Sequence, residues 1–107
     1  MDQPAPLNIV LFREGALMVA RCLEYDIAAQ GETVEAAMAA WVDVFAAQII
    51  IDVRAGREPL AQIGPAPERI FEVFRRAKRL APEPLRLPDE VPPPWMLAAM
   101  HPELRVA

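Results

Sequence analysis

The fold is decided by the stretch Arg21-Cys22-Leu23-Glu24-Tyr25-Asp26-Ile27-Ala28-Ala29-Gln30-Gly31-Glu32-Thr33-Val34-Glu35-Ala36-Ala37, which leads from a β-strand into a helix. Residues 25–30 can form a strand whose side chains alternate between two faces. Gly31 allows the chain to turn, and Thr33 is a favourable N-cap because its hydroxyl accepts a hydrogen bond from a free backbone amide. Glu35 then falls in the first helical turn, where the helix dipole favours an acid. The stretch therefore predicts a strand, a corner and a capped helix.

Two further strands are expected before this corner. Residues 7–14 alternate imperfectly between two apolar faces, and residues 16–23 form a second apolar segment. Gly15 separates the two segments and supplies the positive φ that a tight hairpin turn needs. Joined to residues 25–30, these segments predict an antiparallel meander.

The helix after the corner is expected to continue to Ala55, with Gly56 as its C-cap glycine. Its apolar side chains cover more than one stripe, so we expect burial on more than one side. One side covers the sheet, and the other requires the second helix or another subunit. A dimer or tetramer is therefore expected, with an interface formed by Val42, Ala46, Ile50 and Val53.

The second half of the chain is expected to extend this core. Pro67 opens a second helix that continues to about Leu80. Residues 81–94 contain six prolines and are expected to form an extended strap over the surface. Residues 103–107 predict a last short strand, for which the edge of the sheet is one available position.

The fold class that these elements predict is α+β in a single domain spanning residues 1–107. Its core, residues 7–55, is an antiparallel three- to four-stranded sheet packed on a long helix. The extension, residues 57–107, adds the second helix and the proline-rich strap.

Charge is distributed unevenly between the two halves of the chain. Residues 1–58 contain nine acids and four bases, and residues 59–107 contain six acids and seven bases. An acidic half disfavours binding to phosphates but suits a basic protein partner.

The compartment expected from the sequence is the cytoplasm. Cys22 is the single cysteine, so an intrachain disulfide is excluded. The first residues lack a basic segment followed by an apolar one, so a secretory signal is not expected. The longest apolar run, residues 36–51, is interrupted by Asp43 and Gln48 and is shorter than the roughly 20 residues of a membrane span. No membrane association is expected.

The segment from Val19 to Ala37 resembles the HicB-like antitoxin family. That family combines a hydrophobic strand ending near a cysteine, a short strand, a Gln-Gly-[Asp/Glu]-Thr corner and a helix rich in Glu and Ala. Residues 30–33 match the corner residue by residue, and the similarity covers roughly residues 7–55.

The resemblance implies a partial ribonuclease-H-like fold without catalytic function, in a bacterial protein. Family members neutralise HicA, a small RNA-cleaving toxin, and many repress their own operon through a C-terminal DNA-binding module. Residues 57–107 show no helix-turn-helix or ribbon-helix-helix pattern. The resemblance therefore implies a type II antitoxin without that module, or a solitary family member.

The inventory of reactive side chains predicts no enzymatic activity, metal or cofactor. The chain contains no serine, one threonine, one histidine and one cysteine. Thr33 is explained by capping, Cys22 lies in an apolar strand, and His101 has no second histidine with which to share a metal.

Two charged clusters are candidate contact sites. Glu24, Tyr25 and Asp26 could offer an acidic and aromatic patch to a protein; the alternative, a metal-dependent nuclease, would need more converging acids. The basic cluster contains Arg75, Arg76 and Arg79. These arginines could contact nucleic acid, but cations are also favoured at a helix C-terminus, and a solvated helix face is the preferred interpretation.

Overall fold

The computed structural model describes residues 3–107. Its first element is a β-hairpin in the segment where apolar side chains alternate in the sequence. Strands β1 (Asn8–Glu14) and β2 (Leu17–Cys22) pair in antiparallel fashion, with Ile9 opposite Cys22. Gly15 in the connecting turn has a φ of 64°, as the hairpin prediction requires.

The sheet has five strands and is mixed. It is completed by β3 (Ala28–Gly31), β4 (Lys78–Arg79) and β5 (Glu103–Val106), in the order β3-β2-β1-β5-β4. The α+β class is confirmed, but the sheet is not purely antiparallel, because β5 runs parallel to β1. β5 also lies inside the sheet, since β4 pairs with its other side and takes the edge position.

The second helix is shorter than the sequence predicted. Helix α2 (Glu68–Arg76) ends before Leu80 because the chain leaves it to join the sheet. Lys78 and Arg79 form β4, and the backbone N–H of Leu80 donates to the carbonyl of Leu104 at 2.8 Å. Tertiary pairing with β5 therefore overrides the helical pattern of these residues.

Helix α1 (Val34–Arg54) begins where the corner motif predicted. The Thr33 hydroxyl accepts a hydrogen bond from the Ala36 N–H at 3.0 Å, which confirms its role as the N-cap. Gly31 has a different role from the one expected, because its φ is not positive. A Cβ at Gly31 would lie 2.6 Å from the backbone nitrogen of Ala37, closer than real Cβ atoms come. The glycine is therefore needed for close approach of α1 to β3.

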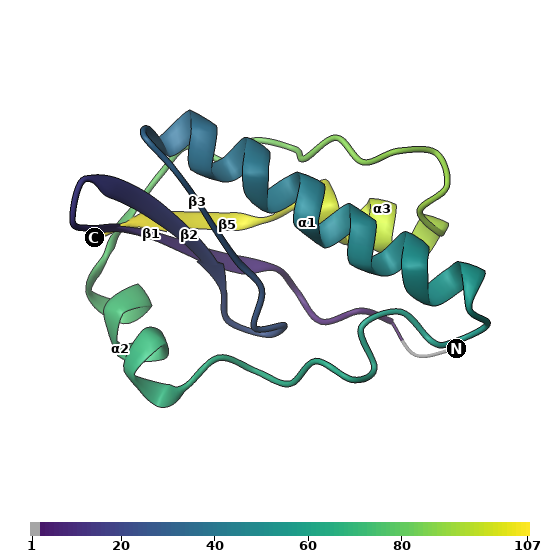
Figure 1. Cartoon of the computed structure of the whole chain (residues 1–107). Helices are drawn as coiled ribbons and strands as arrows, with labels where there is room; N and C mark the ends of the chain where they lie inside the picture. Colours follow the sequence, from purple (N-terminus) through teal and green to yellow (C-terminus); the bar gives the residue numbers. More distant parts are fainter. Residues whose placement is uncertain (1–2) are drawn as a thin grey trace.

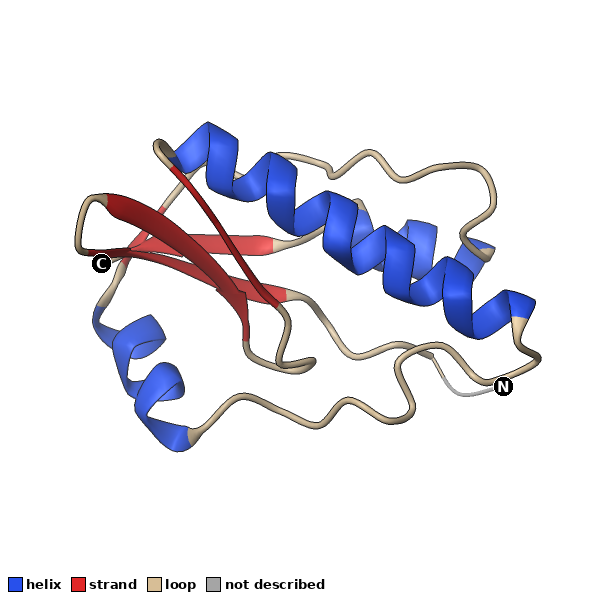
Figure 2. Ribbon diagram, viewed as in Figure 1, coloured by secondary structure: helices blue, strands red, loops and turns tan. Residues whose placement is uncertain are grey.

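The two faces of the sheet are covered by different elements, as Figures 1 and 2 show. α1 lies across one face, where Trp41, Phe45 and Ile49 are fully buried against β1 and β2. α2 covers part of the opposite face, where Ile70 and Phe74 pack on Val10. Each face thus has its own apolar cluster.

The proline-rich segment ends in a third helix, α3 (Pro93–Ala99), so its last two prolines belong to a helix start. The strap (residues 81–92) runs beside α1 and is tied to α3 by the Leu85 N–H, which donates to the Ala99 carbonyl at 2.8 Å. Trp95 of α3 packs edge-on against Phe45 and Tyr25, with ring centroids 6.0 and 5.3 Å away. These aromatic contacts fix α3 under the second half of α1.

α1 is long and apolar enough to cross a membrane by length and composition alone. It nevertheless lies against the sheet with one face in the apolar core, as a core helix of a folded domain does.

We expect Gly31→Ala to reduce the free energy of unfolding by about 1–3 kcal/mol, because the added methyl group must displace the first turn of α1. Urea unfolding followed by circular dichroism measures this change. Gly64→Ala is the matched control, because a Cβ at Gly64 meets nothing within 4 Å. Equal stability of the two variants would contradict the close-approach explanation.

Candidate functional site

The polar atoms of the predicted patch Glu24, Tyr25 and Asp26 are engaged within the chain. The Glu24 carboxylate accepts hydrogen bonds from the backbone N–H and the side-chain amide of Asn8, at 2.8 and 2.7 Å. Asp26 accepts two bonds from the Arg21 guanidinium, the shorter at 2.7 Å. These carboxylates thus brace the turn between β2 and β3 and do not converge on a common point.

The aromatic member of this patch also has an internal role. The Tyr25 hydroxyl accepts a hydrogen bond from the Ala5 N–H at 2.8 Å, while its ring contacts Trp95. The side chain is half-buried and links the N-terminal segment to α3.

Reactive chemistry is limited within residues 3–107. Burial raises the pKa of the Cys22 thiol to about 12, so the sulfur stays protonated at neutral pH. The described chain contains no group of three or more His, Cys, Asp or Glu side chains positioned to hold a metal ion. His101 lies exposed after α3.

The interface residues predicted on α1 are partly covered by the chain itself. Ala46 is buried, and Val42 and Ile50 are half-buried. A shallow depression is shared by these three residues and the strap residues Leu87 and Pro88. The strap thus occupies part of the face for which a subunit was expected, while Val53 remains exposed on the far turn.

A different stripe of α1 is left open to solvent. Val44 and Ile51 are 45% and 54% exposed, and Ala47 between them is also exposed. We call these three residues the outer stripe; their spacing places them on one side of the helix. The sequence could not identify this stripe, because apolar residues surround most of α1 and only the path of the strap determines which of them are covered.

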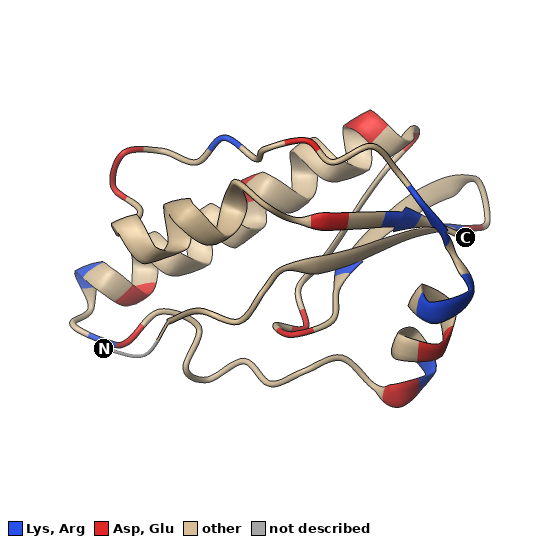
Figure 3. Cartoon of the chain, turned by 180° about the vertical axis from the view of Figure 1, so that it is seen from behind, with Lys and Arg blue, Asp and Glu red and all other residues tan. Residues whose placement is uncertain are grey.

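Charge changes sign along α1, with acids at its start and basic residues at its end, as Figure 3 shows. Glu32, Glu35 and Asp43 are exposed at the corner and along α1. Further basic side chains lie on α2 and β4. The outer stripe therefore lies between an exposed acid, Asp43, and Arg54, which is paired with Glu90.

The basic cluster on α2 is partly neutralised. Arg75 forms ion pairs with Glu68 and Glu72, at 2.7 and 2.6 Å. Arg79 lies 3.5 Å from Glu103, whereas Arg76 is exposed.

A buried carboxylate organises the end of α1. Asp52 accepts a hydrogen bond from the Leu60 N–H at 2.9 Å and pairs with Arg57 at 3.1 Å. The Leu60 N–H, aided by Arg57 and Gln48, lowers the pKa of Asp52. Leu60 has a φ of 60°, which is unusual for a branched side chain, and it is buried. Asp52 thus holds the loop in a conformation that the sequence did not reveal.

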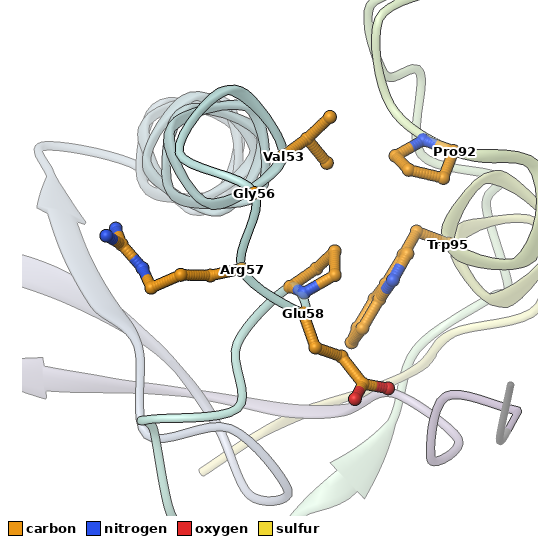
Figure 4. A pocket seen from close by; sticks show the side chains of 7 residues that line it. Val53, Gly56, Arg57, Glu58, Pro92 and Trp95 are labelled. Carbon is orange, nitrogen blue, oxygen red and sulfur yellow. The ribbon is translucent and has the colours of Figure 1, made fainter.

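A pocket of about 440 Å³ lies beside this loop. Val53, Pro92 and Trp95 provide apolar walls, while Arg57 extends away from the pocket, as Figure 4 shows. Glu58 is the carboxylate that lines it. The pocket is open and mostly apolar, without the converging polar groups that orient a small-molecule ligand.

The chain matches no protein-family model, no curated protein and no solved structure. Function is therefore inferred from the geometry of the surface and from the resemblance of the corner motif.

We expect Asp52→Ala to lower the free energy of unfolding by about 2–3 kcal/mol, because the Leu60 N–H loses a charged acceptor in a buried site. Asp43→Ala, an exposed position on the same helix, should change it by no more than about 0.5 kcal/mol. Chemical denaturation at neutral pH measures both changes, and equal losses would contradict the role assigned to Asp52.

The same carboxylate predicts a pH dependence. The pKa of Asp52 is lower in the folded than in the unfolded state. Its contribution to stability is therefore fully present at pH values above the ordinary aspartate pKa of 3.8. That contribution is lost as the pH falls through the lower, folded pKa. The difference in stability between wild type and Asp52→Asn should therefore shrink with acidification below 3.8, as measured by denaturation at several pH values. A difference that stays constant would contradict the assignment.

Proposed function

We propose that this chain is a non-catalytic, HicB-like protein-binding domain of the bacterial cytoplasm. Its partner in this proposal is a small basic protein, such as the RNA-cleaving toxin of a type II toxin–antitoxin pair. The observation that carries the proposal is the outer stripe of α1, an exposed apolar surface with the acid Asp43 at its edge.

The outer stripe is unusual for a surface that stays in water. The most apolar 18-residue window of α1 has a mean hydropathy of 1.7, yet only 28% of it is buried within the chain. Contiguous exposed apolar side chains commonly mark interaction sites. The apolar area supports binding to a protein surface.

The charges beside the stripe favour a basic partner. Asp43 is exposed next to Val44, and the positive charge of Arg54, one turn beyond Ile51, is offset by its ion pair with Glu90. Acidic side chains at the rim of an apolar patch attract a basic protein and orient it during encounter. The negative charge also opposes binding of nucleic acid to this side.

The polar side chains support a non-catalytic role through the structural tasks they already perform. Thr33 caps α1, Cys22 is a buried thiol, and the carboxylates of Glu24 and Asp26 are bonded within the chain. In this proposal, Glu24, Tyr25 and Asp26 support the binding surface by shaping the turn below α1.

A nucleic-acid-associated regulator acting through α2 is the weaker alternative. Arg75 is held by two glutamates, so it would have to leave both partners to contact a phosphate. Arg76 and Arg79 remain the candidates for such contacts.

The proposal is tested by co-purification of the tagged chain from its native host. We expect recovery of a small basic protein that cleaves RNA when isolated and is inhibited when the chain is added back. Ile51→Arg should reduce its affinity for the chain at least tenfold, which corresponds to about 1.4 kcal/mol, because a charge enters an apolar contact. Titration of the purified partner measures the affinity.

Leu97→Arg is the matched control, because Leu97 is equally apolar and 57% exposed but lies on α3. Recovery of the chain alone, or equal loss of binding in both variants, would contradict the proposal. Salt-sensitive binding to DNA or RNA that disappears when Arg75, Arg76 and Arg79 become alanine would favour the alternative.

A further inference from the structure

The outer edge of β3 is an open hydrogen-bonding surface. β3 is the last strand on its side of the sheet. The Cys22 N–H donates to the Ile27 carbonyl at 3.1 Å, so Ile27 faces β2. Because backbone groups alternate in direction along an antiparallel strand, Ala29 and Gly31 also face β2. The N–H and C=O groups of Ala28 and Gln30 therefore point away from the sheet.

β3 is short, but within the strand it carries no charge, proline or bulge that would oppose pairing. Exposed edges are normally blunted by charged side chains, prolines, bulges or very short strands. The opposite edge follows that rule, since β4 consists of Lys78 and Arg79. β3 has the sequence Ala-Ala-Gln-Gly and pairs with β2 without interruption from Ala28 to Gly31. Its outward groups are thus available to another strand.

The position of α1 suits the addition of a second copy at this edge. α1 packs over both β3 and β2. Strands are about 4.8 Å apart, so an antiparallel copy paired through β3 would place its own α1 at an axial distance of about 10 Å. Packed helices are separated by about 8–10 Å. The strand pairing and a helix–helix contact can therefore form together.

Small side chains lie where the two helices would meet. Ala36 is exposed and Ala40 half-buried in the part of α1 nearest to β3. The edge of a four-residue strand, about 13 Å long, cannot by itself supply the roughly 1,000 Å² of a stable interface. Contact between the first halves of the two α1 helices would have to supply the remaining area.

We propose that two copies of this chain join in antiparallel fashion through β3, forming one continuous sheet with the first halves of their α1 helices in contact. A two-fold axis suits this edge because an antiparallel pair of identical strands is self-complementary. The axis passes near Ala29 and Gln30, and the helices overlap only close to it. Ala47 and Ile51 of the outer stripe remain free on both copies. Val44 belongs to the first half of α1 and so lies within reach of this contact, which means that the dimer and the proposed basic partner can share that residue.

The test uses the purified full chain alone. Light scattering after size exclusion should give twice the mass of one chain. Gln30→Pro removes an outward N–H without removing a bond to β2, and should raise the dimer dissociation constant by about tenfold or more. Gln30→Ala, which keeps that N–H, should remain dimeric. Circular dichroism verifies that each variant is folded.

A second pair of variants tests the helix contact even if Gln30→Pro fails to fold. Ala40→Arg should dissociate the dimer, because it places a large charge where the helices meet. Ala47→Arg, two turns further along α1, should not. A wild-type chain that is monomeric at every soluble concentration would overturn the proposal. So would a dimer that is insensitive to Ala40→Arg, or one that dissociates only with Ala47→Arg.

Discussion

The close approach of α1 to β3 is the constraint on which the rest of the structure depends. Only a hydrogen atom fits between Gly31 and the backbone of Ala37. This contact brings the helix onto the sheet immediately after the strand, with Thr33 satisfying a free amide at the corner. Trp41 and Phe45 then stack at 4.6 Å and enter the core. A larger residue at the corner would lift the whole helix, because α1 starts only three residues later.

The length of α1 explains the unusual second half of the chain. At 1.5 Å per residue its 21 residues extend about 31 Å, whereas the seven residues of β1 extend about 23 Å. The helix therefore projects past the sheet, and its last turns need another partner. Trp95, the Asp52-bound loop and the strap provide that support. The proline-rich composition suits this task, since extended segments can follow a helix surface without forming a sheet of their own.

Local chemistry was predictable from the sequence, and long-range pairing was not. The Thr33 cap and the Gly15 turn are set by neighbouring residues, so their patterns identified the elements correctly. The insertion of β5 between β1 and β4 depends on contacts with residues far away in the chain, which no local pattern encodes. The same limit applies to α1. Its apolar circumference predicted more than one buried side, but did not show which residues would be covered. The path of the strap leaves Ala46 buried and Ile51 exposed.

The distribution of polar groups bears on the binding role that we propose for this surface. A catalytic side chain must keep an unsatisfied or perturbed group accessible to its substrate. Here the two buried groups with shifted pKa values face inward: Asp52 is occupied by the Leu60 loop, and the Cys22 thiol is buried in the sheet. The other groups with shifted pKa values are held in ion pairs within the chain, namely Arg21, Glu72 and Arg75. Two other features are open to solvent. One is the set of exposed apolar side chains on α1, and the other is the row of main-chain N–H and C=O groups along the outer edge of β3. Exposed apolar area and open strand edges can both be covered by another polypeptide, which is the physical basis for proposing protein association at this surface.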